Sequence, residues 1–416
     1  MTVPVNKTLV VVGGGAAGFF CAINAARLRP ELKVILLEKT NKLLSKVRVS
    51  GGGRCNVTHA CFDIRELSTR YPRGTHFVRK AFHRFFTENT IEWFAERDVQ
   101  LKTESDGRMF PVTDNSQTIV ECLLREASRY NVDIRMQTTV EKLQLTEANQ
   151  FQLHTDKNQL LTADYVCIAC GGYPKSSMFD WLRATGHTIE EPVPSLFTLN
   201  VPNHPITALM GVSVPEARVR IAGSKLEQTG PVLITHWGFS GPAVLRTSAW
   251  GARDLQKMNY HFTCQINWLG DKQEPLLREE FQLYRHERAA QKIINKNPWQ
   301  LPQRLWEFML QQCEIAQDTR WADLPAKAQN KLIKELVNSE FNVTGKTTFK
   351  EEFVTAGGIK LSEIDPQTMM SRKLPHLFFA GEIMDVDGIT GGFNFQHAWT
   401  SGWIAANSIA AATDLL

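Results

Sequence analysis

The stretch Leu9-Val10-Val11-Val12-Gly13-Gly14-Gly15-Ala16-Ala17-Gly18 decides the fold of this chain. It contains a short apolar run, a glycine turn and the first residues of a helix that continues from Phe19. A second apolar strand, Val34 to Leu37, follows and ends in Glu38. This order of strand, glycine turn, helix, strand and acidic residue predicts a parallel α/β sheet of the dinucleotide-binding kind.

Each glycine of the turn has a separate physical purpose. Gly13 allows the tight turn at the end of the strand, Gly15 lets a pyrophosphate approach the backbone, and Gly18 lets the helix pack close to the sheet. The N-terminus of the helix, at Ala16 and Ala17, offers free N–H groups and a partial positive charge to phosphates. We therefore expect these five residues to hold a pyrophosphate.

Glu38 lies twenty residues after Gly18, at the end of the second strand. A carboxylate at this point accepts hydrogen bonds from a ribose 2′-OH and repels a 2′-phosphate. The ligand is then FAD or NAD rather than NADP. We expect Lys39, the next residue, to line the same site.

The segment from Lys46 to Thr58 favours FAD over NAD. A plain NAD dehydrogenase usually has another helix after the acidic residue, whereas this chain has a glycine triplet followed by a basic residue. Glycines let backbone N–H groups converge on a ligand, and a basic side chain can neutralise a phosphate or a reduced flavin. The cofactor-binding residues predicted here are Lys46, Ser50, Gly51, Gly52, Gly53, Arg54, Cys55 and Asn56.

The far end of the chain supplies a matching half. An apolar strand from Leu377 ends in a glycine and a carboxylate, and a helix-like stretch from Phe393 to Ala411 follows a second glycine turn. In flavoproteins of the glutathione reductase type, the acid binds a flavin hydroxyl and the helix N-terminus faces the flavin N1/O2 region. The residues expected to contact FAD are Gly381, Glu382, Gly391, Gly392, Phe393 and Asn394.

Two further segments lie mid-chain. Val140 begins a strand whose backbone is expected to meet the adenine. The stretch Asp164 to Gly172 resembles the strand-to-loop crossing that such proteins mark with Ala-Thr-Gly, with Cys170 in the threonine position. Its predicted cofactor-binding residues are Ala169, Gly171 and Gly172. Separated segments thus converge on one FAD site.

These motifs resemble the bacterial flavoprotein family variously labelled YhiN, BaiN-like or aminoacetone oxidase-like. The resemblance is carried by Ser50 to Asn56, Thr235 to Ala243, Thr355 to Ile359, and Ala380 through Asn394. It implies FAD, an inserted second region and reduction of an enone-like C=C bond. It does not supply the substrate itself.

The expected fold is α/β, a Rossmann-type FAD-binding domain of the glutathione reductase type with an inserted β-barrel-like domain and a helical subdomain. We predict an FAD-binding domain over 1–191 and 354–416, a β-rich domain over 192–273 plus about 340–353, and a helical subdomain over 274–339. A second GxGxxG is missing from the sequence, so NAD(P)H, as a possible reductant, would bind only transiently.

The composition is that of a soluble globular protein, and the length of 416 residues suggests two or three domains. The net charge of +4 gives no reason to expect nucleic acid or an acidic membrane as a partner, and no apolar stretch is long enough to span a bilayer. Eight cysteines form no dense framework, Cys167 and Cys170 would face opposite ways on a strand, and no metal site is expected. We expect a cytoplasmic protein of unspecified oligomeric state that acts on a small molecule.

Catalytic residues are less well marked, because flavin performs the hydride chemistry itself. The weak candidates are His236, Tyr173, Cys55 and His397. Arg54 could favour the Cys55 thiolate, although a packed thiol is the simpler interpretation. The predicted function is an FAD-dependent oxidoreductase that transfers hydride between flavin and a small organic substrate held between the FAD and inserted domains. The alternatives are a flavin amine oxidase and a flavoprotein that acts on or binds RNA or protein.

Overall fold

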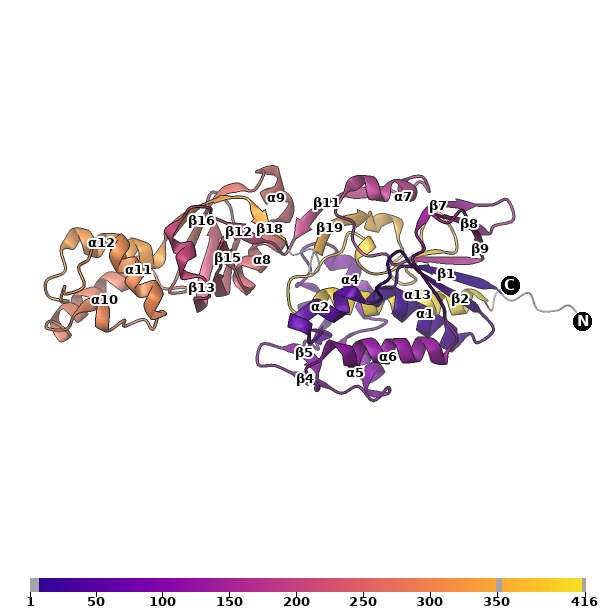
Figure 1. Ribbon diagram of the computed structural model, residues 1–416, viewed down its shortest axis with the longest axis horizontal. Coiled ribbons are helices and arrows are strands. Elements are labelled where there is room, and N and C mark those ends of the chain that lie inside the picture. Colours follow the sequence, from indigo (N-terminus) through magenta and orange to yellow (C-terminus); the bar gives the residue numbers. More distant parts are fainter. Residues whose placement is uncertain (1–6, 349–353, 414–416) are drawn as a thin grey trace, which may run out of the picture. The chain divides into compact units, whose positions relative to one another are not determined.

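The computed structural model describes residues 7–348 and 354–413 and divides the chain into two compact units (Figure 1). Unit 1 comprises Met1–Ser195 and Lys350–Leu416, and unit 2 comprises Leu196–Phe349. Unit 2 is therefore inserted into the sequence of unit 1. Each unit is described separately below.

Unit 1 is built on a five-stranded parallel sheet in the order β20-β10-β1-β2-β6. Central β1 pairs with β10 on one side and β2 on the other, so that Val10 lies between Val166 and Ile35. Apolar residues run continuously along β1 and β2 because both faces of a parallel sheet are covered. The strands are β1 (Thr8–Val12), β2 (Lys33–Glu38), β6 (Asp133–Met136), β10 (Tyr165–Ile168) and β20 (Leu377–Phe379).

Helices α1 (Ala16–Leu28) and α13 (Phe393–Thr413) come from opposite ends of the chain and pack against each other (Figure 1). Gly402 permits the close approach, since a Cβ there would lie 2.6 Å from the carbonyl oxygen of Ala17. Both helices are buried over most of their length. The first turn of α1 thus meets the middle of α13, and Gly381, just after β20, also approaches Ala17 in that turn.

The remaining elements of unit 1 form smaller layers around this core. Its helices are α2 (Ser45–Gly53), α3 (Ile64–Ser68), α4 (Thr75–Phe82), α5 (Thr87–Ala95), α6 (Ser116–Arg129) and α7 (Asp180–Arg183). Three smaller sheets complete unit 1. The first has the order β3 (Thr58–His59), β5 (Arg108–Pro111), β4 (Leu101–Thr103), and the second has the order β7 (Val140–Leu145), β8 (Phe151–Thr155), β9 (Leu160–Ala163). The third pairs β11 (Ile189–Ser195) with β19 (Val354–Ile359).

Unit 2 contains a seven-stranded antiparallel sheet in the order β17-β16-β13-β14-β15-β12-β18. Its two edge strands are consecutive in sequence and are separated only by Gly345, at φ 141°. The sheet therefore curls until its edges approach each other, which gives the barrel-like form predicted from the sequence. The strands are β12 (Thr198–Asn200), β13 (Ser213–Ile221), β14 (Glu227–Ile234), β15 (Gly238–Ser240), β16 (His261–Asn267), β17 (Ser339–Thr344) and β18 (Lys346–Thr347).

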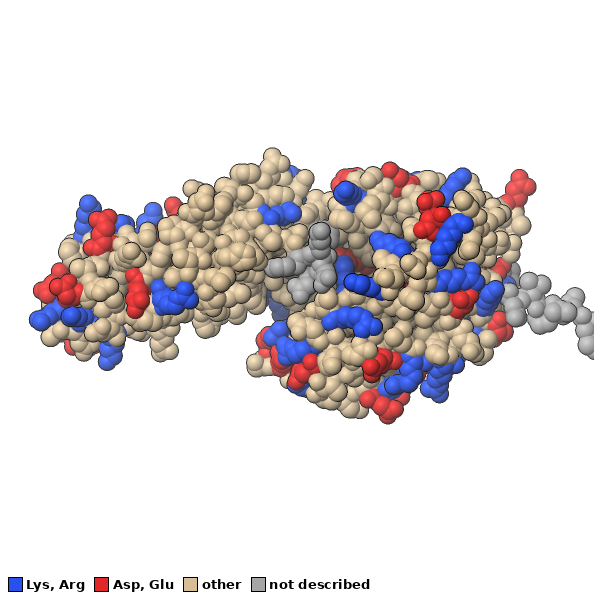
Figure 2. Space-filling model, in the orientation of Figure 1, with Lys and Arg blue, Asp and Glu red and all other residues tan. Residues whose placement is uncertain are grey.

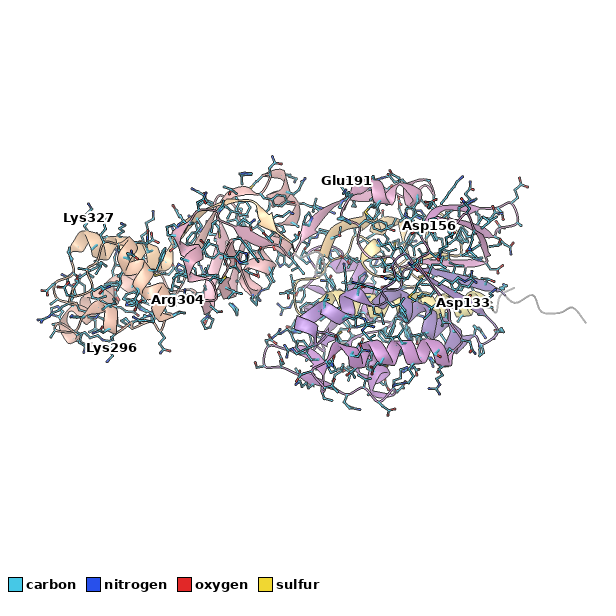
Figure 3. The ribbon with its side chains drawn as sticks, in the orientation of Figure 1. Asp133, Asp156, Glu191, Lys296, Arg304 and Lys327 are labelled. Atoms are coloured by element: carbon cyan, nitrogen blue, oxygen red, sulfur yellow. The ribbon has the colours of Figure 1, made fainter. Side chains whose placement is uncertain are left out.

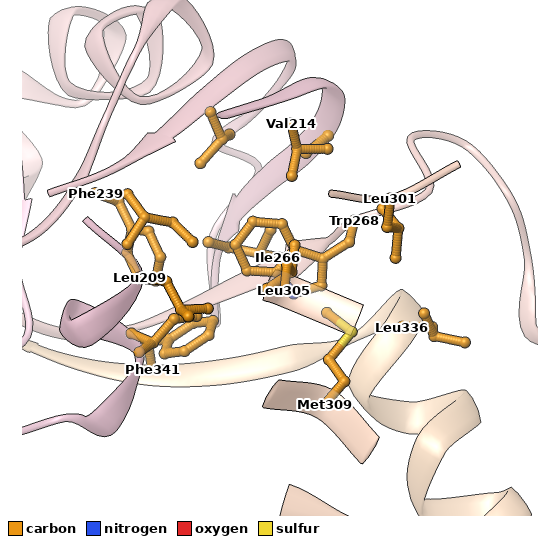
Figure 4. Close-up of a cluster of buried hydrophobic side chains, with 14 of the residues drawn as sticks. Leu209, Val214, Phe239, Ile266, Trp268, Leu301, Leu305, Met309, Leu336 and Phe341 are labelled. Atoms are coloured by element: carbon orange, nitrogen blue, oxygen red, sulfur yellow. The ribbon is translucent and has the colours of Figure 1, made fainter. Parts of the chain in front are cut away.

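The helices of unit 2 share a hydrophobic core with this sheet (Figure 4). Trp268 and Phe341, on the sheet side, lie in one buried cluster with Leu305, Met309 and Leu336 of the helices. The indole N–H of Trp268 donates to Ser339 Oγ at 3.0 Å, which satisfies its polar atom. The helices are α8 (Pro242–Trp250), α9 (Ala252–Lys257), α10 (Glu274–Glu287), α11 (Gln303–Gln312) and α12 (Ala326–Val337).

Charged side chains of both signs are scattered over the face of the protein shown in Figure 2. Among residues 7–348 and 354–413, no helix is long and apolar enough to cross a membrane.

Candidate flavin site

The strand–turn–helix of the opening motif forms with its glycines in two distinct environments. A Cβ at Gly18 would lie 1.9 Å from the carbonyl oxygen of Gly13, so this glycine is required by helix–sheet packing. A Cβ at Gly13 would lie 2.3 Å from the oxygen of Ala169, on the neighbouring strand. At Gly15, by contrast, a Cβ would meet nothing within 4 Å. The turn is thus closed toward the sheet and open at Gly15, next to the N-terminus of α1.

Glu38 is held at the edge of this opening. Its Oε2 accepts from the N–H of Gly14 at 2.9 Å, and its Oε1 accepts from the N–H and the hydroxyl of Thr40, both at 2.8 Å. The Glu38 carbonyl accepts from the N–H of Thr138, which places Val140 close by in sequence and space. The Nζ atom of Lys39 lies 5.5 Å from the ring centroid of Tyr173. The carboxylate is therefore oriented before any ligand arrives, as a ribose-binding group needs to be.

The glycine triplet interrupts α2. The backbone is not helical at Ser50, Gly51 and Gly52, and both of these glycines have positive φ. A Cβ at Gly52 or Gly53 would meet nothing within 4 Å, whereas one at Gly51 would lie 2.8 Å from the ring of Phe110. The triplet consequently presents bare backbone to open space on one side.

Arg54 follows the triplet and is held by two kinds of contact. Its Nη1 lies 2.6 Å from Glu104 Oε1 and 3.6 Å from Asp114 Oδ1. Its guanidinium carbon lies 4.0 Å from the ring centroid of Phe110, a cation–π contact. These contacts fix the cation beside the glycine triplet.

The glycine segment also contacts the N-terminus of α13. The side chain of Asn56 donates to the carbonyl of Thr58 and accepts from the N–H of Gly392, both at 3.0 Å. His59 stacks on Phe393 with centroids 4.7 Å apart, and its Nδ1 lies 3.0 Å from the oxygen of Gly391. Two segments more than 330 residues apart in sequence therefore form one wall.

Asn394 has a structural role within this wall. Its side-chain oxygen accepts from the N–H of Gly388 at 2.8 Å, and its nitrogen donates to the Gly388 carbonyl at 2.9 Å. Both amide atoms thus hold the turn that starts α13.

Glu382 is the centre of a second cluster. Its Oε2 lies 2.6 Å from Nζ of Lys46, and its Oε1 accepts from the N–H of Thr355 at 2.8 Å. A Cβ at Gly172 would lie 2.5 Å from Thr355 Oγ1 and 2.9 Å from Glu382 Oε1. The preceding Gly381, at φ 74°, approaches Ala17 on α1. This cluster joins the Lys46 segment, β19, the Gly172 crossing and the end of β20 to the first turn of α1.

Together these contacts bring the predicted segments into one region of unit 1. An added Cβ would meet no atom closer than 3.9 Å at four of the glycines, so the space next to their backbone is open. These glycines are Gly15, Gly52, Gly53 and Gly171. Such a cradle suits a cofactor with a pyrophosphate, several hydroxyls and a flat ring. Backbone N–H groups and helix N-termini bind its negative charges, and the two carboxylates accept hydrogen bonds from its hydroxyls. The donor set therefore fits FAD.

The four catalytic candidates lie in different surroundings. His397 is 2% exposed on α13, its Nε2 lies 3.3 Å from the Gly381 oxygen, and burial lowers its pKa to about 4. Tyr173 is buried edge-on against Phe179, and burial raises the pKa of its hydroxyl. His236 is exposed in unit 2 next to Trp237.

Cys55 is a packed thiol, the simpler of the two interpretations of the sequence. It is fully buried, and burial raises the pKa of its thiol to about 12, while Arg54 faces Glu104 and Phe110 instead. Cys167 is hydrogen-bonded to Cys21 rather than to Cys170, and all eight cysteines are free. The described ranges contain no group of three or more His, Cys, Asp or Glu side chains suited to a metal ion.

Two residues of the site were not predicted as ligands from the sequence. Thr355 lies within a motif of the family resemblance, yet its contact with Glu382 depends on the pairing of β19 with β11. His59 lies three residues after Asn56, and only the packing of β3 against α13 brings it onto Phe393. Its proximity to the glycine segment was the only available signal.

A family model described as HI0933-like protein Rossmann domain matches residues 7–408. The chain belongs to the HI0933-like family. The match confirms the family resemblance drawn from the sequence motifs.

Curated relatives of this HI0933-like protein match along nearly its whole length. A 3-dehydro-bile acid delta(4,6)-reductase of Clostridium scindens is 29% identical over 96% of this chain and 98% of the relative. A ribosomal RNA dihydrouridine synthase of Escherichia coli is 31% identical over 97% of this chain and 98% of the relative. The protein of the same name from Haemophilus influenzae is 28% identical.

Solved structures share the fold at low sequence identity. The 3-ketosteroid delta1-dehydrogenase of Sterolibacterium denitrificans has a TM-score of 0.52 at 12% identity, covering 98% of this chain and 100% of that chain. The 3-ketosteroid-delta4-(5alpha)-dehydrogenase of Rhodococcus jostii has a TM-score of 0.50 at 12% identity, covering 97% and 98%. The predicted fold class, a Rossmann-type FAD-binding domain with an inserted unit, is confirmed.

Proposed function

We propose that this HI0933-like protein reduces a C=C bond conjugated to a carbonyl group. That it is an FAD-dependent oxidoreductase follows from its family and fold. The bond that it reduces is the proposal. The glycine-lined cradle, in which bare backbone, Glu38 and Glu382 are already positioned for the cofactor, supports flavin chemistry, and the activities of the curated relatives support the bond.

The chain's own residues would bind and orient the cofactor. Gly15 and the first turn of α1 would take the pyrophosphate, Glu38 the adenosine ribose, and Glu382 a hydroxyl of the flavin chain. The N-terminus of α13, at Gly392, would stabilise negative charge at the flavin ring. Reduced FAD held by these residues would supply the hydride, which would go to the carbon β to the carbonyl, and a proton would go to the α carbon.

The curated relatives support this reaction class. A delta(4,6)-reductase of a 3-dehydro-bile acid acts on C=C bonds of a ketone, and dihydrouridine forms from uridine when the ring C=C bond next to a carbonyl is saturated. Both reactions are the addition of two electrons and two protons to a polarised C=C bond. The chain is about equally similar to both relatives, and the proposed reaction is the step that they share.

NAD(P)H is the proposed electron donor. It would bind transiently, because the sequence carries one dinucleotide fingerprint and the FAD occupies it. The eight free thiols suit a reducing compartment, so we place the protein in the bacterial cytoplasm.

Anaerobic rapid mixing tests the proposal. The purified flavoprotein is mixed with NADH or NADPH while absorbance is followed at about 450 nm, and the reduced protein is then mixed with a small cyclic enone. Bleaching followed by recovery, with formation of the saturated ketone, supports the proposal. If an amine bleaches the flavin absorbance instead, and the absorbance recovers only when oxygen is admitted, the result supports a flavin amine oxidase.

A second candidate substrate is a uridine in ribosomal RNA. Two curated relatives named for this activity favour it, at 31% and 28% identity across almost the whole chain. It requires the same hydride step, because the uracil C5=C6 bond is conjugated to the C4 carbonyl. The two candidates differ only in what carries the bond to the flavin, a free small molecule or a polynucleotide.

A further inference from the structure

The net positive charge of this protein comes from unit 2. Residues 196–349 contain 18 Lys and Arg against 14 Asp and Glu, whereas the rest of the chain contains 29 of each. The whole excess of +4 thus lies in the inserted unit, outside the flavin cradle. A polyanionic partner would be attracted to this unit rather than to the cofactor-binding unit.

Within unit 2, two cations face each other without an acidic partner. Lys292 and Arg320 form an antiparallel β-bridge, flanked by hydrogen bonds from Ile293 N–H to Thr319 at 3.0 Å and from Trp321 N–H to Gln291 at 3.1 Å. Ile293 and Trp321 are buried, so side chains alternate and the two cations share the exposed face.

Like charges directly opposite each other on strands are destabilising. Among the residues that the structure describes, no acid lies within 4 Å of the Lys292 or Arg320 side-chain nitrogens; Glu287 and Asp318 are the acids nearest to them in sequence. Elsewhere on the helices of unit 2, Arg278 lies 2.6 Å from Glu274 and Lys331 lies 3.3 Å from Glu314. The bridge therefore presents an uncompensated pair of positive charges to solvent.

Aromatic rings cluster around Trp321, the residue that follows Arg320. Tyr284 and Trp299 are partly exposed and pack on the buried Trp321, with Tyr284–Trp321 centroids 5.4 Å apart. Lys296, which is labelled in Figure 3, is a third exposed cation of this segment and lies four residues after Lys292 in sequence. Cations that reach phosphates, beside rings on which bases can stack, are the combination used to bind single-stranded RNA.

We propose that Lys292, Lys296 and Arg320 form a docking edge for RNA on unit 2. This inference rests on the second candidate of the proposed function, in which the reduced bond belongs to a uridine of ribosomal RNA. An acidic protein would use the cations but would leave the partly exposed ring of Trp299 without a matching group; the ring of Tyr284 already has the guanidinium carbon of Arg288 4.6 Å from its centroid. RNA uses both the cations and the Trp299 ring.

The test compares K292Q/R320Q with the matched control K225Q, which also removes an exposed cation of unit 2 from a site on the β13–β14 turn. In vitro transcribed bacterial ribosomal RNA, which carries no modified nucleotides, is the probe. We expect K292Q/R320Q to bind about tenfold more weakly at low salt and to lower the slope of log K against log salt by about 1.4, because two phosphate contacts are lost. K225Q should bind as wild type does.

Two readouts separate failure of this inference from failure of the proposed function. If wild type forms dihydrouridine in the RNA and K292Q/R320Q retains its affinity and slope, the docking edge is wrong and the function stands. If wild type binds no ribosomal RNA but reduces a small enone, the docking edge is wrong and the small-molecule function stands. Displacement of the RNA by poly-L-glutamate at equal charge concentration would overturn the inference in favour of an acidic protein partner.

Discussion

Gly15 and Gly18 are three residues apart, at the N-cap and in the first turn of α1, and alanine substitutions at them should have opposite consequences. At Gly15, φ is −95° and ψ is −171°, a conformation open to alanine, and the added Cβ meets nothing within 4 Å. At Gly18 the added Cβ lies 1.9 Å from the Gly13 oxygen and 3.4 Å from Val11 Cγ1. Only the second substitution collides with the protein itself.

The magnitudes follow from these contacts. Gly15→Ala should lower the free energy of unfolding of the FAD-free protein by less than about 1 kcal/mol, the usual difference between glycine and alanine at a helix N-cap. Its methyl group would occupy the place of the pyrophosphate, and losing one charge-assisted hydrogen bond of about 1.5–3 kcal/mol would weaken FAD binding about 10- to 150-fold. Gly18→Ala should cost about 3 kcal/mol of stability, because the helix must move away from the sheet.

Fluorescence titration of FAD and urea unfolding of the FAD-free proteins measure the two effects separately. The reasoning predicts weak FAD binding with a near-normal unfolding midpoint for Gly15→Ala, and a clearly lower midpoint for Gly18→Ala. Wild-type FAD affinity in Gly15→Ala would refute the assignment of this opening to the pyrophosphate. Equal loss of stability in both variants would refute the distinction between the open and packed glycines.

Three further predictions concern buried groups. Asp387→Asn should destabilise the protein by about 3 kcal/mol in urea unfolding, because it removes the buried carboxylate that pairs with Arg73; Arg73→Met/Asp387→Asn should recover part of the loss, and an additive loss would contradict this. Burial lowers the pKa of His397 and of His187 to about 4, so the unfolded chain binds more protons as pH falls from 6.5, and stability should decline by roughly 3 kcal/mol per buried histidine between pH 7 and 4. His397→Gln should flatten this decline, and an unchanged pH profile would show that the histidine is not buried in its neutral form. Cys55→Ala should keep the rate of flavin reduction within about threefold of wild type, since a buried thiol with a pKa of about 12 is no nucleophile, and loss of reduction in a folded, flavin-loaded variant would contradict this.

The nucleotide half of the site could be predicted from sequence because it is local. Gly13, Gly15, Gly18 and Glu38 lie within one strand–turn–helix–strand unit, where hydrogen bonding and close packing fix the geometry over about 30 residues. The structure shows these residues in the expected relation, with Gly18 packed and Gly15 open.

The flavin half was predictable only as a set of segments. That Glu382 would meet Lys46 and Thr355, or that His59 would stack on Phe393, depends on strand pairing and helix packing between distant parts of the chain. Periodicity and glycine content carry no information about such pairings. For Cys55 the sequence favoured a packed thiol over a thiolate activated by Arg54, and burial does raise the pKa of this thiol.

Unit 2 shows the same limit. Short strand-like runs predicted a β-rich region, and the closure of its sheet follows only from the pairing of β18 with β12 after the single residue Gly345. The opposition of Lys292 and Arg320 likewise requires the register of a β-bridge between segments 28 residues apart. From composition alone, the charges of this region are nearly balanced.

Anaerobic reoxidation of the reduced flavoprotein tests the central claim most directly. The protein is reduced, freed of excess reductant and mixed without oxygen with a cyclic enone or with unmodified ribosomal RNA, while absorbance near 450 nm is followed and the products are identified by mass spectrometry. We predict recovery of the oxidised flavin spectrum together with a product heavier by two hydrogens at the conjugated C=C bond. A stable reduced flavin with every conjugated carbonyl compound and RNA, reoxidised only when oxygen is admitted, would contradict the account.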